Sequence, residues 1–158
     1  MATVSGPVEP VIDAVLHASR ALVAVAARSL ASVACDVTLP QYRTLVVLAG
    51  RGPQGTAVLA AALGVNPSTA TRMCDRLVRK GLVRRRTASQ DRRQVRLALT
   101  EAGRRLVQEV TDRRRQELAL IMATLPAEER EGLTRSLTAF ATAAGEVADQ
   151  DWTAGWEL

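Results

Sequence analysis

Residues 63–83 read LGVNPSTATRMCDRLVRKGLV and contain the clearest helix boundaries in the chain. Gly64 is expected to end a short helix, because glycine readily adopts the left-handed backbone that closes a helix. Asn66 is a strong N-cap and Pro67 suits a first turn, so a second helix is predicted from Pro67 to about Lys80. Two helices joined by so short a turn indicate a helix-turn-helix.

The second helix has two chemically different faces. At about 100° per residue, its apolar residues share one arc, which is expected to face the core: Ala70, Met73, Cys74, Leu77 and Val78. The opposite side is polar, with Thr69 and Thr71 on its flanks: Ser68, Arg72, Asp75, Arg76 and Arg79. Such groups can meet base edges and phosphates in a DNA major groove, where Arg72 can donate two hydrogen bonds to a guanine. An ordinary amphipathic helix with a solvated basic face has the same pattern.

A two-stranded hairpin is predicted directly after this helix. Beyond residue 81 the hydrophobic period changes from about 3.6 to 2, which is typical of strands. Residues 82–87 and 94–99 can pair as antiparallel strands around the polar tip 88–93. A thin ribbon that carries guanidinium groups at its tip can enter a minor groove. The tip groups are Asp91, Arg92 and Arg93.

Asp91 is unexpected in a surface that meets phosphate. We expect it to pair with a neighbouring arginine such as Arg85, which would fix the loop and aim Arg93. On this hypothesis Asp91→Ala weakens DNA binding although it removes a negative charge, and tighter binding by that variant would refute it.

Helices are expected on both sides of this segment. Residues 7–35 carry a broad apolar stripe and predict one long helix. Thr38-Leu39-Pro40-Gln41 resembles a capping box that starts a helix to about Ala49. After a loop rich in glycine and proline, Thr56 to Leu63 is predicted as a short helix. Thr100 is a candidate N-cap for a long helix to about Leu125, Pro126 starts a last helix, and residues 149–158 are expected to form a loose tail.

Composition favours one compact, mainly helical domain with a polyanionic partner. The 158 residues suit a single domain, and 3% aromatic content means that Ala, Val and Leu must build the core. Residues 72–115 hold 15 basic and 5 acidic side chains, a net charge of +10. Such a block attracts a polyanion, either nucleic acid or an anionic membrane. Since Lys80 is the only lysine, a GC-rich coding bias is an alternative source of the arginine excess.

The sequence lacks the motifs that several other classes of protein require. With His17 as the single histidine and no CxxC motif around Cys35 or Cys74, neither a metal site nor a structural disulfide is expected. There is no Ser-His-Asp set and no glycine-rich phosphate loop, so we expect neither an enzyme nor a cofactor. The first basic residue is Arg20 and no uninterrupted apolar run approaches the length that spans a bilayer. The prediction is a cytoplasmic protein without a membrane partner.

Six short motifs follow one another along the chain: residues 39–43 (LPQYR), 63–72 (LGVNPSTATR), 75–77 (DRL), 80–83 (KGLV), 91–93 (DRR) and 97–103 (LALTEAG). A helix-turn-helix pattern alone is weakly specific. The ribbon motif at this distance from the helix, running into Leu-Thr-x-x-Gly, is strongly specific. With these motifs the chain resembles winged helix-turn-helix repressors of the MarR (multiple antibiotic resistance regulator) type, from about residue 11 to residue 148.

The resemblance implies a single MarR-like domain over residues 1–158 that forms an obligate homodimer. Residues 7–36 and 100–148 would form the dimerisation helices and residues 38–99 the winged helix-turn-helix lobe. Apolar stripes on long terminal helices agree, because they exceed what one small lobe can cover. A two-fold dimer demands a pseudo-palindromic operator, with half-sites about 10 base pairs apart or a multiple of that.

The implied function is that of a sequence-specific double-stranded DNA-binding transcriptional regulator, a repressor released by a small-molecule effector. The alternative is a winged-helix architectural or protein-interaction module without a ligand response. The candidate DNA-binding residues are Thr56, Ser68, Thr69, Thr71, Arg72, Arg76, Arg85, Arg86, Arg92 and Arg93, with Asp91 as a stabiliser of the wing.

The resemblance also implies a crevice for a small aromatic or anionic effector between the dimer helices and the lobe. Its candidate residues are His17, Arg20, Tyr42 and Arg43. A histidine among apolar residues in mid-helix is more often packed in an interface than bound to a ligand, and packing is likewise the favoured role of Tyr42 over recognition. Thiol sensing is disfavoured, because Cys35 lies at the far end of the first helix and Cys74 on the core side of its helix.

Overall fold

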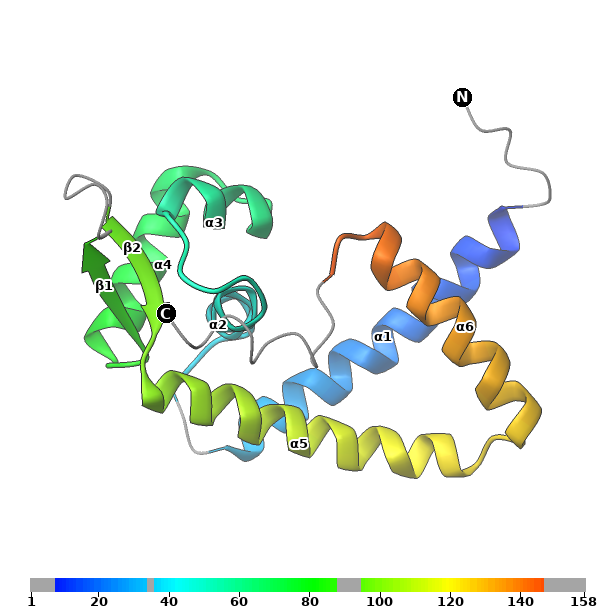
Figure 1. Cartoon of the computed structure of the whole chain (residues 1–158). Coiled ribbons are helices and arrows are strands. Elements are labelled where there is room, and N and C mark those ends of the chain that lie inside the picture. Colours follow the sequence, from blue (N-terminus) through cyan, green and yellow to red (C-terminus); the bar gives the residue numbers. More distant parts are fainter. Residues whose placement is uncertain (1–7, 34–35, 88–94, 147–158) are drawn as a thin grey trace.

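The computed structural model describes residues 8–33, 36–87 and 95–146 and has the predicted, mainly helical winged-helix architecture (Figure 1). A lobe of three helices and a β-ribbon is joined to an arm of long helices. The elements are α1 (Glu9–Ser32), α2 (Leu39–Arg51), α3 (Thr56–Leu63), α4 (Pro67–Arg79), β1 (Val83–Thr87), β2 (Val95–Leu99), α5 (Glu101–Ala123) and α6 (Ala127–Ala143).

These bounds agree with the predicted elements to within a few residues. The short helix α3 has the predicted limits, and α1 is shorter at both ends than the predicted 7–35. The predicted hairpin tip at 88–93 and the tail at 149–158 lie outside the described residues.

Local side-chain caps explain where three of the helices begin. Thr38 and Gln41 form the predicted capping box at the start of α2. At the start of α4 the Asn66 side chain accepts a hydrogen bond from the backbone N–H of Thr69 at 2.9 Å. Thr100 caps α5 in the same way. Each cap satisfies an N–H group that a helix start leaves without a partner.

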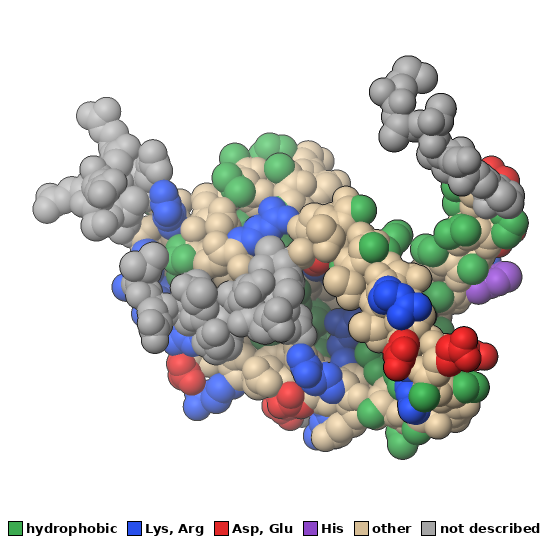
Figure 2. Space-filling view, turned by 45° about the vertical axis from the view of Figure 1, so that its right-hand side comes forward, with side chains coloured by type: hydrophobic (Ala, Val, Ile, Leu, Met, Phe, Trp, Pro, Cys, Tyr) green, Lys and Arg blue, Asp and Glu red, His purple; other side chains and the backbone are tan. Residues whose placement is uncertain are grey.

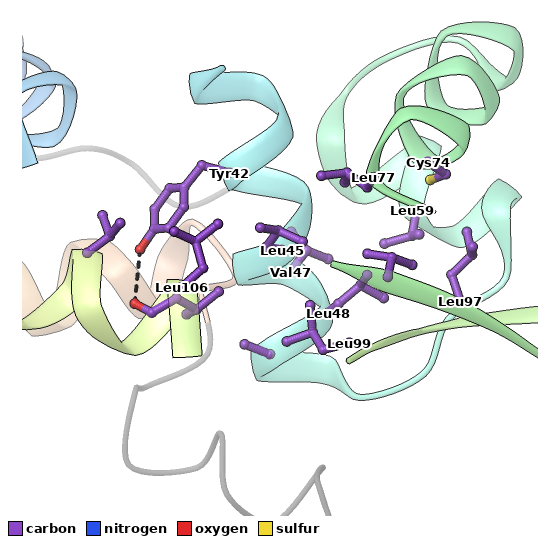
Figure 3. Packing of buried hydrophobic residues seen from close by; sticks show 14 of the residues in the cluster. Tyr42, Leu45, Val47, Leu48, Leu59, Cys74, Leu77, Leu97, Leu99 and Leu106 are labelled. Carbon is purple, nitrogen blue, oxygen red and sulfur yellow. Dashed lines mark hydrogen bonds between the residues drawn. The ribbon is translucent and has the colours of Figure 1, made fainter. Parts of the chain in front are cut away.

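The core of the lobe is built from leucine and valine side chains of every element around it. Leu45 of α2, Leu59 of α3 and Leu77 of α4 are fully buried and converge in one cluster (Figure 3). Leu97 of β2 closes the cluster on the ribbon side. This packing fixes α4 against the lobe by its apolar face and leaves its other face outside.

The two strands pair antiparallel with Val83 opposite Leu99 and Arg85 opposite Leu97. The segment before α3 adds a further rung that the sequence did not predict. Gln54 donates its backbone N–H to the carbonyl of Leu97 at 3.0 Å and accepts the Leu97 N–H at 2.8 Å. The base of the ribbon is therefore held by backbone hydrogen bonds on both sides of β2.

The arm exposes much more apolar surface than the lobe. Helix α1 packs on α5, whereas none of the residues of α6, all of which the structure describes, is buried. Large exposed apolar side chains line the three helices: Val11, Ile12, Val15, Leu16, Leu22, Val23, Leu120, Ile121, Leu137 and Phe140. A single chain leaves these faces uncovered.

Helix α1 is also long and apolar enough to cross a membrane, by length and composition only. Its most apolar 18-residue window has a mean hydropathy of 1.5, which a search for uninterrupted apolar runs does not detect. Three exposed polar residues break the apolar run within this continuous helix: Asp13, His17 and Arg20. The sequence-based expectation concerned uninterrupted apolar runs, and these polar residues break any such run, so the averaged hydropathy of α1 does not contradict it.

Candidate nucleic-acid interface

The exposed face of α4 carries the predicted hydroxyl and guanidinium groups. Ala70, Cys74 and Leu77 are buried, while Arg72 and Arg76 are exposed. The two faces deduced from the helical period are therefore confirmed. The helix presents its cationic groups to solvent because its apolar face is fixed in the core.

The hydroxyl groups at the start of α4 already donate hydrogen bonds within the helix. Ser68 donates to the Asn66 side chain at 2.8 Å, and Thr71 donates to the carbonyl of Pro67 at 2.9 Å. Their oxygen lone pairs can still accept from a base amino group, since a hydroxyl both donates and accepts. Thr69 is half-buried and lies on the flank of the helix.

Arginines of the two strands share one face of the ribbon. Arg86 and Arg96 lie directly opposite each other in the antiparallel register, and Arg84 precedes Arg86 by two residues. Side chains at these positions project to the same side of a β-ribbon, and all three are exposed. Like charges directly opposite each other destabilise a strand pair. This arrangement therefore favours an anionic partner over the face.

Arg84 and Arg96 were not among the sequence-predicted site residues. The period of two that identified the strands also places Arg84 and Arg96 on the same face as Arg86. The alternation of side chains could therefore have predicted both residues. Arg92, Arg93 and Asp91, which the sequence placed at the tip, lie outside the described residues.

Arg85 points to the other side of the ribbon and forms an ion pair with α4. Its Nη2 donates to Oδ1 of Asp75. The predicted pairing of Arg85 with Asp91 involves a residue outside the described part of the chain. Asp75, which the sequence analysis assigned only to the polar face of the helix, is the acid that Arg85 contacts.

An open cavity of about 290 Å³ runs along the flank of α4 and reaches the start of α2. Its lining combines two guanidinium groups with apolar and hydroxyl side chains: Thr38, Pro40, Gln41, Thr69, Arg72, Met73 and Arg76. The first turn of α2 and the cationic face of α4 therefore border one hollow.

A model of the MarR family matches residues 37–95, from just before α2 to the first residue of β2. The crystal structure of RV1404 from Mycobacterium tuberculosis aligns with a TM-score of 0.83 and 46% identity, covering 91% of this chain and 98% of that one. A MarR family protein from Bacillus stearothermophilus aligns with a TM-score of 0.78 and 25% identity, covering 88% and 96%. The chain belongs to the MarR family.

The alignments with curated relatives cover a smaller share of those proteins than the alignments with the two solved structures do. The HTH-type transcriptional repressor NicR of Pseudomonas putida is 36% identical over 99 residues, which are 61% of this chain and 63% of NicR. An uncharacterized HTH-type transcriptional regulator of Bacillus subtilis, YfiV, is 27% identical over 103 residues, or 65% and 64%. The chain thus spans less than two-thirds of the length of these relatives.

The four candidate effector residues of this MarR protein have different environments. His17 and Arg20 are exposed on α1. Tyr42 is 5% exposed, points towards α5 (Figure 3), and its hydroxyl donates to the carbonyl of Val107 at 3.5 Å. Tyr42 therefore has the packing role that the sequence favoured over ligand recognition. None of the four lines the cavity beside α4.

Arg43 holds the end of α6 against the lobe. Both of its Nη atoms donate to the carboxylate of Glu146, one of them at 3.0 Å. Eight residues along the same helix, Arg51 donates to the carbonyl of Gly145 at 3.1 Å. An anionic ligand at Arg43 would have to compete with Glu146.

Cys74 is poorly suited to redox sensing. Burial is the largest influence and raises the pKa of its thiol; Asp75 raises the pKa further, and Arg85 opposes them. A raised pKa reduces the fraction of reactive thiolate at neutral pH. Cys35 lies outside the described residues, within which no group of three or more His, Cys, Asp or Glu side chains could hold a metal ion.

Two further predicted DNA contacts have defined positions. Thr56 is half-buried and begins α3 directly after its N-cap, Gly55. Arg86 is exposed one residue before the end of β1. The space-filling view shows Lys and Arg side chains spread over the visible face, together with Asp and Glu side chains along its lower and right-hand parts (Figure 2).

Proposed function

We propose that this MarR family protein is a sequence-specific double-stranded DNA-binding transcriptional regulator that represses its target genes as a homodimer. The observation that carries the proposal is the placement of two cationic surfaces on one lobe. One is the outer face of α4 with Arg72 and Arg76, and the other is the ribbon face with Arg86 opposite Arg96.

Each surface suits a different groove of the duplex. A helix with hydroxyl groups at its start and arginines along its length fits a major groove, where guanidinium groups read guanine. The narrow ribbon fits the adjacent minor groove, whose negative potential attracts arginine. The residues proposed to contact DNA are Ser68, Thr69, Thr71, Arg72 and Arg76 in the major groove, Arg86, Arg92 and Arg93 at the wing, and Thr56 near phosphate.

The homodimer follows from the uncovered apolar faces of α1, α5 and α6. A monomer rarely exposes so much contiguous apolar surface. Pairing two chains through these helices would present two lobes related by two-fold symmetry. Such a pair reads a pseudo-palindromic site, with half-sites about one helical turn apart or a multiple of it.

The name of NicR supports repression, and release by a small aromatic or anionic effector completes the proposal. The competing function is an architectural or protein-binding module that recognises DNA without sequence preference. Competition of the DNA complex with phenolic and antibiotic-like compounds tests the effector. An active compound is expected to release the DNA at fixed salt.

Binding to the promoter region beside the gene, compared with random DNA of the same length and at the same salt, tests the function. We expect a specificity ratio of at least about 10³ and a protected footprint with two-fold symmetry. A ratio near one would favour the architectural module.

Removing the two tip arginines tests the role of the wing. Arg92→Gln with Arg93→Gln is expected to weaken operator binding and to reduce the salt slope by about 1.8, because each phosphate contact contributes about 0.9. The control removes the same charge from α6, by Arg130→Gln with Arg135→Gln. Because α6 belongs to the proposed dimer interface, light scattering must first show the dimer mass of the wild type, and operator affinity and slope are then expected to be nearly unchanged. Equal behaviour of the two pairs would contradict a specific role for the wing.

A further inference from the structure

Asp75 is an acidic residue on the DNA-facing side of α4. It is half-buried and has Arg72, Arg76 and Arg79 as neighbours on the same side of the helix. A carboxylate here repels phosphate and lowers the positive potential that attracts DNA. Asp75 must therefore contribute something to the structure that compensates for the weaker attraction of DNA.

The contact of Asp75 supplies such a contribution. Arg85 Nη2 donates to Asp75 Oδ1 across the turn that joins α4 to β1. Arg85 follows Val83 by two residues, so the two side chains project to one side of the ribbon, and Val83 is buried in the core. Arg84 and Arg86 project to the opposite side. The ion pair therefore lies between the ribbon and α4.

The turn itself fixes only the first part of the ribbon. Gly81 has a φ of 69°, and the N–H of Leu82 donates to the carbonyl of Leu77 at 3.0 Å. Arg85 lies three residues beyond this bond. At this level the opposite strand is held to the segment before α3 by the Gln54–Leu97 rung. The Arg85–Asp75 pair instead ties the first strand to α4, so it restrains the angle between ribbon and helix.

Solvent exposure limits what the ion pair adds to folding. The side chains of Arg85 and Asp75 are 54% and 37% exposed, and exposed pairs contribute little to stability. The effect of the ion pair on the angle between α4 and the ribbon is separate from its effect on stability. DNA binding requires α4 and the ribbon to meet adjacent grooves at the same time, so a small change in their angle affects both contacts.

We propose that Asp75 is a positioning residue that holds Arg85, and with it the arginine face of the wing, at the angle to α4 that DNA requires. This inference rests on the proposed function and refines it. Arg85 then orients the ribbon, and Arg86 on the opposite side meets the nucleic acid.

Asp75→Asn tests the inference with two duplexes of about 30 base pairs, or roughly three helical turns. One is selected from a random pool by the wild-type protein, and the other is a shuffled sequence of the same composition. We expect the selected duplex to bind about fivefold more weakly, while the shuffled duplex binds equally well or more tightly. Loss of a negative charge alone would tighten the binding of both duplexes alike.

The salt dependence separates positioning from a general loss of structure. Asp75→Asn frees the Arg85 guanidinium to take a phosphate, so the salt slope is expected to steepen by about 0.9. Arg85→Gln is expected to weaken the selected duplex to a similar extent with an unchanged slope. Arg86→Gln, with the same charge change on the opposite side of the strand, is expected to reduce the slope by about 0.9.

The double variant Asp75→Asn with Arg85→Gln is expected to bind no more weakly than either single variant, because both remove the same tie. Melting temperatures close to that of the wild type establish that the variants are folded. Should Asp75→Asn not fold, Arg85→Gln tests the same tie from its other side.

The inference is overturned if Asp75→Asn retains the wild-type ratio between the two duplexes, or if the losses from the single variants add. A wild-type protein that does not distinguish the duplexes would instead overturn the proposed function. The two failures are therefore distinguishable.

Discussion

Gly103 shows how one residue joins the arm to the lobe. A Cβ atom built at this position would lie 2.1 Å from the carbonyl oxygen of Leu82 and 3.2 Å from a methyl group of Leu99. The same carbonyl accepts the backbone N–H of Thr100 at 3.0 Å. The glycine of the Leu-Thr-x-x-Gly motif is thus explained by the close approach of α5 to the turn before β1.

Gly103→Ala is expected to destabilise the protein by about 2–4 kcal/mol, because backbone rather than a flexible side chain must move. Chemical denaturation at one protein concentration measures the change. Gly132→Ala is the matched control, since beyond its two neighbours and the local backbone of its own helix a Cβ there meets no atom within 4 Å. Removing glycine from the interior of α6 should stabilise by about 0.5–1 kcal/mol, and equal losses at both positions would contradict this account.

At the scale of elements, helix α4 depends on its cap. Asn66 accepts the Thr69 N–H and also the Ser68 hydroxyl, so one side chain orders the whole start of the helix. The positive end of the helix dipole lies at the same place. A negative charge at this position should therefore raise the stability of the fold but lower its affinity for DNA.

Asn66→Ala is expected to cost about 1 kcal/mol of stability, because it removes the cap. Asn66→Asp keeps the cap and adds a favourable interaction with the dipole of about 0.3–1 kcal/mol. The aspartate variant should nevertheless bind operator DNA more weakly than wild type, since it places a negative charge at the end of the helix that meets DNA. Thermal melts and binding titrations test this, and tighter binding by Asn66→Asp would contradict the proposed orientation of α4.

At the scale of the whole molecule, the arm is incomplete in a single chain. Val23 of α1 is 58% exposed, and α6 buries none of the residues that the structure describes along it. Covering an apolar side chain of this size contributes about 1.5–3 kcal/mol. A second chain is the partner that we propose for these faces.

Val23→Asp is expected to shift the dimer towards monomer, because a charge would enter the proposed apolar interface. Val58→Asp is the matched control, since Val58 lies on α3 in the lobe and is 51% exposed. Light scattering across a range of protein concentrations measures the molecular mass. A dimer that withstands Val23→Asp as well as Val58→Asp would show that this part of α1 lies outside the interface.

Predictions from sequence succeeded where short-range chemistry decides the structure. The limits of α3, the capping box of α2 and the two faces of α4 follow from interactions between residues three or four positions apart. The resemblance to the MarR family followed from short motifs of the same kind. A contact between distant elements, such as that of Arg43 with Glu146, has no comparable local pattern.

The winged-helix architecture, the cationic face of α4 and the family could therefore be predicted from the amino-acid order alone. The ion pair of Arg85 with Asp75 and the extra rung at Gln54 became visible only in the folded chain. The physical reason is that helix starts, helix ends and strand periods depend on near neighbours in the chain. Ion pairs and packing between elements depend on how the buried leucines bring those elements together.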